Sequence, residues 1–573
     1  RARVPRSGLR GGRCASSVPQ IGQMRTVRQV LDAHAQEGQR YPPPLLGASW
    51  SALGKLAREP AERRALRAEP RLLEPLASAT ARALPGFDER PLAATADSLA
   101  GLHAAGWRAA GEGAEALWEG LAARGAQLAD DMRPAHLCRL ARAYAIAGRP
   151  AGLDSLAHAA APRLYTFAPR ELAQLVWACA KARHAAPALL DAVATEVAQR
   201  AVGQRARPPA DGARGVSEFN LFNPQDLANT VWAYAKLGHP APELLDALGA
   251  QALARAQWHT FRPQNLAIIA WAFAKLRQPA PALLDAIGAA SAPRLRDGEF
   301  SQQELCSVAW AYARAGHPSP PLFAAIAKTA PDQLAGCSPQ GLSQLAWAHA
   351  KLGLAAPHLL DAIAHEAAPR LRECSTHELA NLAWAYAVLE HQSAYLLGAL
   401  AGHARSRLHQ FTPQELAKTA LSYATLATPR GNFVARSPMP HLSRENRRSY
   451  VPLAARPLVD GIAQLAAVRA ADFTPRELTN LAWACAVLHH RVPTFFDVVA
   501  REAAVRTAEY DAQSLTTTAW ALAVVDHEGS EVDALFRAGG FTRRCAALFG
   551  GVEGGEGGGE GGGGGEGGEG GEG

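Results

Sequence analysis

Basic, amide and indole side chains recur at fixed intervals along most of this 573-residue sequence. Each copy of the pattern is counted from an aromatic or small residue, offset 0, as in the run FTPQEL that begins at Phe411. Cations neutralise phosphates, amides hydrogen-bond bases and indoles stack on them, so these residue types offer noncovalent binding of single-stranded RNA. A basic residue stands at offset 14 in five successive copies: Lys181, Lys236, Lys275, Arg314 and Lys351.

Two further rows accompany these cations. Offset 10 is Trp in eight copies: Trp177, Trp232, Trp271, Trp310, Trp347, Trp384, Trp483 and Trp520. Offset 7 is polar in eight of nine copies but changes its identity, and packing alone gives no reason for amides there. The predicted RNA-binding residues are therefore Gln174, Lys181, Asn229, Lys236, Lys275, Ser307, Arg314, Gln344, Lys351, Asn381, Lys418 and Asn480.

A tandem repeat must position these rows. Successive starts between Phe222 and Phe411 are separated by 37 or 39 residues, and each copy reads as two amphipathic helical segments. Repeats of this length stack into solenoids in which each unit contacts its neighbours. The sequence predicts an all-α, right-handed α-solenoid of about ten helical-hairpin repeats of 37–39 residues. The copies begin at Met132, Phe167, Phe222, Phe261, Phe300, Cys337, Cys374, Phe411, Phe473 and Tyr510.

The start of each first helix carries recognisable capping residues. In the copy at Phe411, Thr412 is placed as the N-cap, Pro413 as the first helical residue and Glu415 as its capping-box partner. Phe411 and Leu416 are spaced as a hydrophobic staple. These signals predict a first helix of about 15 residues, closed by Gly or His, and a second helix that opens with Pro.

A helical wheel divides the first helix into two sides. Offsets 5, 8, 9 and 12 are mostly apolar and form a core stripe, whereas offsets 3, 7, 10 and 14 fall together on the other side. In a stacked array equal offsets align, so the second side predicts a polar row, a cationic row and a Trp row. The alternative interpretation is an armadillo-like protein-interaction scaffold, in which Trp acts as an inter-repeat wedge and Lys answers the helix dipole.

Other recurrent residues are expected to be structural. Acids at one offset of the second helix are attributed to the favourable macrodipole of a helix's first turn: Asp191, Asp246, Asp285, Asp361, Asp460 and Asp497. The eight Cys form no CxxC pair, and the register places most of them in buried positions. Neither a metal nor another cofactor is expected. No HExxH, P-loop, GxSxG or kinase motif occurs, so the chain is not expected to be an enzyme.

Charge and composition divide the chain further. The formal net charge is +7, and the last 24 residues contain six Glu without a basic residue, so the rest carries +13. Residues 1–30 hold seven Arg and no acid, which is typical of an organelle transit peptide, and no apolar run is long enough to span a bilayer. The predicted domains are a transit-like segment (1–45), degenerate helical repeats (46–130), the solenoid (131–548, with insertions at 203–219 and 427–457) and a disordered Gly/Glu tail (549–573).

The repeat F-x-P-Q-E-L-A-N-x-x-W-A-x-A-K-L, followed by P-x-L-L-D-A-I, resembles helical-repeat RNA-binding proteins of organelles. Similar families are the octotricopeptide repeats, the leucine-rich repeats of the FAST-kinase-domain proteins, and the RNA-editing substrate-binding complex subunit six. The resemblance extends over residues 132–527 and implies a role in RNA stability, processing, editing or translation. The expected partners are single-stranded organelle RNA and subunits of an RNA-processing complex, without membrane insertion. The expected location is the mitochondrial matrix, with the plastid (chloroplast) stroma as second choice.

Overall fold

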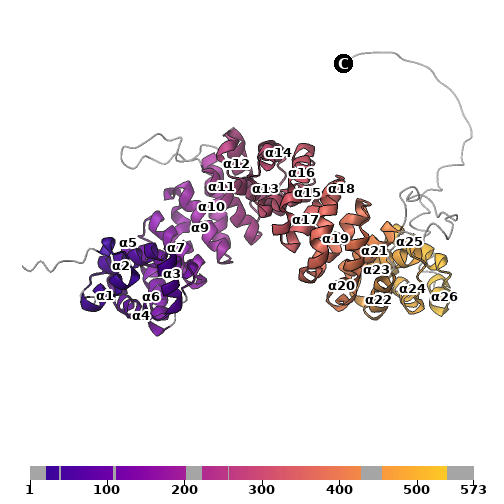
Figure 1. Ribbon diagram of the computed structural model, residues 1–573, viewed down its shortest axis with the longest axis horizontal. Coiled ribbons are helices and arrows are strands. Elements are labelled where there is room, and N and C mark those ends of the chain that lie inside the picture. The colour runs from indigo at the N-terminus through magenta and orange to yellow at the C-terminus, as the bar shows by residue number, and fades with distance from the viewer. Residues whose placement is uncertain are drawn as a thin grey trace, which may run out of the picture. The chain divides into compact units, whose positions relative to one another are not determined.

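The computed structural model describes residues 21–37, 41–107, 111–201, 222–255, 257–427 and 455–537 (Figure 1). Within these ranges every regular element is a helix and no strand occurs. The chain forms two compact units, Arg1–Leu322 (unit 1) and Phe323–Gly573 (unit 2). The predicted insertions, the Gly/Glu tail and the first 20 residues of the transit-like segment lie largely or wholly outside the described residues.

Unit 1 consists of two helical layers that run side by side after the N-terminal helix α1 (Val27–Glu37) and the short α3 (Pro60–Ala68). Consecutive members of each layer contact one another, and α5, α7, α11 and α13 also pack on the helix that follows each of them. The first-helix layer contains α2 (Pro43–Leu56), α5 (Glu89–Ala104), α7 (Pro134–Ala147), α9 (Pro169–Lys181), α11 (Pro224–Leu237), α13 (Pro263–Leu276) and α15 (Gln302–Ala315). The second-helix layer contains α4 (Glu74–Ala83), α6 (Glu112–Leu128), α8 (Leu153–Ala160), α10 (Pro187–Ala201), α12 (Pro242–Ala254) and α14 (Pro281–Arg296).

Unit 2 repeats this arrangement, and the unit boundary falls inside α16 (Pro320–Thr329). Its first helices are α17 (Pro339–Leu352), α19 (Thr376–Val388), α21 (Pro413–Leu426), α23 (Pro475–Val487) and α25 (Ala512–Val524). Its second helices are α18 (Pro357–Ala367), α20 (Ala394–Arg405), α22 (Ala455–Val468), α24 (Pro493–Val505) and α26 (Ser530–Arg537). Neighbouring helices contact one another in series within each layer. The predicted α-solenoid is therefore confirmed, whereas its handedness and exact repeat number stay predictions.

Short 3-10 helices occur at the start of the described chain and between α-helices, many of them just before a first helix. They are η1 (Ile21–Gln23), η3 (Leu84–Gly86), η4 (Pro150–Gly152), η5 (Ala161–Thr166), η6 (Trp258–Thr260), η7 (Ala330–Gly336), η8 (Ala368–Glu373), η9 (Leu408–Gln410), η11 (Ala470–Asp472) and η12 (Thr507–Glu509).

The predicted helix starts are present. The Glu415 amide donates to Thr412 Oγ1 at 3.3 Å, and the Thr412 amide donates to Glu415 Oε2 at 3.0 Å, which completes the capping box. Phe411 and Leu416 are both buried beside it. Several first helices end at a glycine in the left-handed region, such as Gly238 at φ 68°, where a residue without Cβ is favoured. The first helices from α9 to α25 have 13 or 14 residues, slightly fewer than predicted.

Tyrosines at offset 12 bind successive hairpins together. In each case the buried hydroxyl donates to a carbonyl of the preceding second helix: Tyr144 to Leu121, Tyr234 to Leu190, Tyr312 to Leu284, Tyr386 to Leu360 and Tyr423 to Leu397. These bonds fix the stacking of one repeat on the next with a directional contact, in addition to apolar burial.

The acid row also joins hairpins, so its attribution to the helix dipole was wrong. Asp191 and Asp285 are the fifth residues of α10 and α14, and no acid stands in the first turn of either helix. Five of the six acids instead face a His in the loop that closes the following first helix, whereas the Asp246 carboxylate accepts from Gln278 Nε2 at 2.8 Å. The His Nε2 or Nδ1 to Asp Oδ1 distances are 2.8–3.0 Å in these five pairs: His239–Asp191, His317–Asp285, His391–Asp361, His490–Asp460 and His527–Asp497. Asp154, outside the predicted row, makes the same contact with His184 at 3.1 Å.

Arginines near the end of the second helix form a third recurrent contact. Each guanidinium donates to the carbonyl of the offset-0 residue 33 positions earlier: Arg255 to Phe222, Arg294 to Phe261, Arg370 to Cys337, Arg407 to Cys374 and Arg506 to Phe473. Part of the basic excess of the chain is therefore used to hold each hairpin closed, and only the remaining cations are available to a partner.

Candidate nucleic-acid interface

The structure places the predicted rows on the accessible side of the first helices. From the copy at Phe167 to the copy at Phe473, offsets 5, 8, 9 and 12 are buried and offset 3 is exposed. Offsets 7 and 10 are half-buried in the same copies, so part of each polar side chain and of each indole remains accessible. The helical wheel therefore identified the solvent-accessible side of each first helix, because the core stripe packs between the helices that flank it.

Unit 1 carries four exposed cations on consecutive first helices. They are Lys181 on α9, Lys236 on α11, Lys275 on α13 and Arg314 on α15. Among the described residues, none of the four has a carboxylate within ion-pair distance. The pKa of Lys275 is lowered, mainly by partial burial and also by the positive charge of Lys236. Like charges held this close without a counter-charge are the arrangement expected of a surface that binds a polyanion.

The polar row in unit 1 is partly engaged in its own contacts. Gln225 Nε2 donates to Asn229 Oδ1 at 3.0 Å on α11, and Asn265 Nδ2 of α13 donates to Gln225 Oε1 at 3.2 Å. Ser307 Oγ donates to the Gln303 carbonyl of its own helix at 2.7 Å. Gln174 on α9 occupies the equivalent half-buried place. Amide contacts between neighbouring first helices are therefore shown for α11 and α13, through Gln225 and Asn265.

In the cationic row, Lys275 lies against an indole of its own helix. Lys275 Nζ is 4.9 Å from the centre of the Trp271 ring, one turn earlier on α13. The ring quadrupole of an indole attracts an ammonium over its face. This attraction holds the Lys275 charge beside Trp271 on the exposed side of α13.

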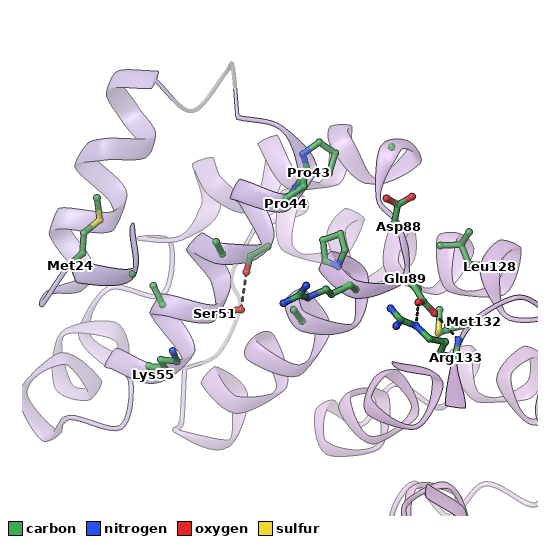
Figure 2. Close-up of a pocket in the computed structure, with 18 of the residues that line it drawn as sticks. Met24, Pro43, Pro44, Ser51, Lys55, Asp88, Glu89, Leu128, Met132 and Arg133 are labelled. Atoms are coloured by element: carbon green, nitrogen blue, oxygen red, sulfur yellow. Dashed lines mark hydrogen bonds and ion pairs between the residues drawn. The ribbon is translucent and has the colours of Figure 1, made fainter. Parts of the chain in front are cut away.

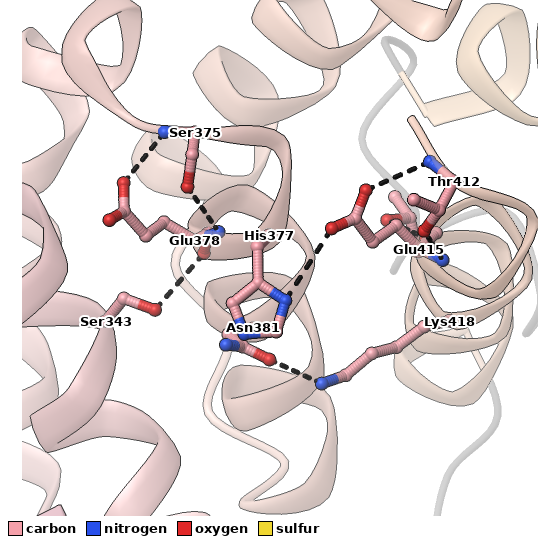
Figure 3. A network of polar contacts seen from close by, with 9 residues as sticks. Ser343, Ser375, His377, Glu378, Asn381, Thr412, Glu415 and Lys418 are labelled. Carbon is pink, nitrogen blue, oxygen red and sulfur yellow. Dashed lines mark hydrogen bonds and ion pairs between the residues drawn. The ribbon is translucent and has the colours of Figure 1, made fainter. Parts of the chain in front are cut away.

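Unit 2 has a different arrangement around Asn381, shown in Figure 3. Lys418 Nζ of α21 donates to Asn381 Oδ1 of α19 at 2.6 Å and lies 4.8 Å from the centre of the Trp384 ring. Burial lowers the pKa of Lys418 to about 8. His377 Nδ1, on the same side of α19, approaches Glu415 Oε1 at 3.6 Å. Two residues predicted to bind RNA independently, Asn381 and Lys418, are thus bonded to each other.

The other predicted residues of unit 2 lie on the same side without such a network. Gln344 on α17 and Asn480 on α23 are half-buried, and Lys351 is exposed at the end of α17. After Lys351 the cationic row stops, and offset 14 is occupied by half-buried Val388, Thr425, Val487 and Val524.

Two arginines on α7 were missed by the sequence analysis. Arg139 and Arg142 occupy offsets 7 and 10 of the copy that starts at Met132, where the polar residue and Trp stand elsewhere. Both donate to the carboxylate of Asp97 on α5, Arg139 from Nε at 3.0 Å. Applying the same register to that divergent copy would have found them, because their offsets follow directly from its start.

A cavity of about 1120 Å³ opens beside α2 and α5 (Figure 2). Its lining includes small and proline residues, such as Gly47 and Pro91, and charged residues of both signs. Arg133 at its edge is bound to Glu89, which also accepts a bond from the Arg133 amide at 2.7 Å. The pKa of Glu89 is lowered, although burial opposes that shift, because bonds from Arg133 and His136 stabilise the carboxylate. Three basic residues (Lys55, Arg90, Arg133) and three acidic residues (Asp88, Glu89, Asp131) line the hollow, so it has no net positive charge comparable to that of the cationic row.

The described residues include no group of three His, Cys, Asp or Glu side chains arranged to hold a metal. Burial raises the pKa of the Cys485 thiol to about 12 and that of Cys374 to about 11, which disfavours thiolate chemistry. No described helix is long and apolar enough to cross a membrane.

Comparison with known proteins identifies one family whose model matches part of the repeat array. The chain is similar to helical-repeat RNA-binding proteins, as its repeat pattern predicted. Residues 216–437, which include α11 to α21, match the family model described as RNA-editing substrate-binding complex 6 protein. No curated protein matches the sequence. The crystal structure of the pentatricopeptide repeat protein PPR10 from maize aligns at 13% identity over 92% of each chain, but with a TM-score of only 0.20, too low to inform the fold.

Proposed function

We propose that this protein binds single-stranded RNA on its first-helix face and acts, without catalysing a reaction itself, in organelle RNA processing, stability, editing or translation. The observation that carries the proposal is the row Lys181, Lys236, Lys275 and Arg314 on four consecutive helices. These cations have no counter-charge among the described residues, and they adjoin amides and half-buried indoles. Phosphates, base edges and base faces are the matching groups of single-stranded RNA.

The family match supports the biological context. The matched family is named for a complex that binds RNA-editing substrates, and it overlaps three of the four cations in that row, Lys236, Lys275 and Arg314. We extend from this an association with other subunits of an RNA-processing complex. The acid-free, Arg-rich residues 1–30 support the mitochondrial matrix as the location, ahead of the plastid stroma.

The test is fluorescence anisotropy of the whole protein with a mixed single-stranded RNA pool over a series of salt concentrations. A logarithmic plot of affinity against salt should have a slope of about −0.7 for each phosphate contact. A variant with Lys236, Lys275 and Arg314 changed to Gln should bind more weakly and flatten that slope by about 2.

A matched control removes the same charge from the other layer. Arg372, Arg405 and Arg501 are exposed at or near second helices, and their change to Gln should leave the slope close to that of the unmodified protein. Equal effects of the two triple variants would show a nonspecific charge effect. Absence of binding to any pool at low salt would refute the proposal and favour the armadillo-like scaffold.

A further inference from the structure

The first-helix face differs chemically between the two units. In unit 1, α9, α11, α13 and α15 each present an exposed cation at offset 14. Among the described first helices of unit 2, only α17 does so, through Lys351. The four later helices carry Val388, Thr425, Val487 and Val524 at that offset, all half-buried.

Acidic residues do not compensate for this difference. Carboxylates at offset 4 occur on first helices of both units, such as Glu304 on α15 and Glu415 on α21. In both helices that carboxylate is bonded to the backbone at the N-cap, so it serves the helix start. The contrast in charge between the two faces therefore comes from offset 14, at the other end of the helix.

Uncharged hydrogen-bonding groups remain on the unit 2 face. Asn480 on α23 and Thr517 on α25 are half-buried at offset 7, and an indole stands at offset 10 of each helix. The cation at offset 7, Lys418, is already bonded to Asn381 and partly desolvated. Such a face can contact base edges and base planes, but it can neutralise few phosphates.

We propose that the two units contact different parts of the same RNA: unit 1 holds the phosphate backbone through Lys181, Lys236, Lys275 and Arg314, and unit 2 contacts the bases through Asn480, Thr517 and the neighbouring indoles. The inference rests on the proposed RNA binding and adds a division of roles to it. Unit 1 then supplies the salt-dependent affinity, whereas unit 2 supplies the preference among bases. Phosphate contacts carry no sequence information, so the two contributions are separable by experiment.

The test uses full-length variants and three kinds of single-stranded probe of equal length: homopolymeric RNAs, a mixed RNA and an abasic phosphodiester strand. The first variant changes Lys181, Lys236, Lys275 and Arg314 to Gln. Four lost contacts should flatten the salt slope by about 2.8 and weaken binding to the abasic strand, while the ranking of the homopolymers stays the same.

The second variant changes Asn480 and Thr517 to Ala, which suits a helix and leaves the core intact. It should lose the discrimination among homopolymers, with an unchanged salt slope and unchanged affinity for the abasic strand. The matched control changes Gln464 on α22 and Thr494 on α24, exposed polar residues of the second-helix layer, to Ala and should keep that discrimination. Circular dichroism spectra confirm that each variant is folded.

The outcomes separate the two proposals. If the unmodified protein binds no RNA, the proposed function and this inference both fail. If it binds RNA but the first variant keeps its salt slope, or the Asn480 and Thr517 variant keeps its base discrimination, only the division of roles is overturned.

Discussion

The hydroxyl of Tyr386 offers a direct test of how successive hairpins are joined. It is buried on α19 and donates to the Leu360 carbonyl of α18 at 2.6 Å. Changing Tyr386 to Phe keeps the ring and removes one bond between the two hairpins. A buried hydrogen bond contributes about 1 kcal/mol net, which corresponds to a roughly fivefold change in a local opening equilibrium. Phe273 occupies the same offset on α13, so the ring alone is compatible with the repeat.

Hydrogen exchange measured by mass spectrometry gives the local readout, because unfolding of a long repeat array is not expected to be two-state. Backbone amides of α18 and α19 should exchange about fivefold faster in the Tyr386→Phe variant. The control is Tyr395→Phe on α20, which removes the same hydroxyl from a residue that is 62% exposed. Equal exchange rates in the two variants would refute the view that this hydroxyl holds the hairpins together.

Three further predictions concern the other recurrent contacts and the buried groups. Arg407→Met removes bonds of 2.9 and 3.2 Å to the Cys374 and Leu371 carbonyls and should destabilise that hairpin by about 2 kcal/mol, measured as roughly 30-fold faster hydrogen exchange in α19 and α20, without weakening RNA binding. Arg407→Lys should not restore this stability, since an ammonium lacks the guanidinium fork. A full rescue by Lys would contradict the view that the Arg407 guanidinium bonds hold the hairpin closed. Lys418→Met should stabilise the protein by about 1 kcal/mol at pH 7, a value reduced for solvent screening. Since the pKa of Lys418 is about 8 when folded and 10.5 ordinarily, its charge costs stability below pH 8. This cost in folding free energy disappears as pH rises from 8 to 10.5. A Lys418→Met variant that is less stable than the unmodified protein at pH 7 would refute this reasoning. Burial raises the pKa of four described thiols: Cys138, Cys179, Cys374 and Cys485. At pH 8 these thiols should react with a thiol reagent much more slowly in the native protein than in urea-unfolded protein. Rapid labelling of the native protein would contradict this prediction.

Local signals in the sequence were sufficient for the helices and their orientation. Thr412 and Glu415 lie three positions apart on one helix start, so their bond depends on almost nothing beyond that turn. The buried side of each first helix followed from the apolar period, and the predicted packing role of Cys485 is consistent with its burial. Arg139 and Arg142 were missed because their copy of the repeat is divergent, although the offsets of the repeat register apply to it as well.

Contacts between hairpins could not be read in the same way. His239 and Asp191 are 48 positions apart, so the acid row looked like helix-dipole chemistry until its partner was found. The bond from Arg407 to the Cys374 carbonyl and the Lys418–Asn381 bond likewise join residues more than 30 positions apart. A lysine that appeared to be one more free cation is in fact partly desolvated and bonded to another residue of the predicted site.

The sequence by itself determined the helical repeat, the capped ends of its helices and the side on which cations, amides and indoles align. Each of these depends on residues within about one or two helical turns of one another. The tertiary structure alone decided which polar groups are used internally and which remain available. It also showed that the cationic row of unit 1 has no counter-charge among the residues that the structure describes, whereas Lys418 of unit 2 is bonded to Asn381. The reason is that stacking brings distant residues together, and the free energy of a charged group depends on the neighbours it acquires there.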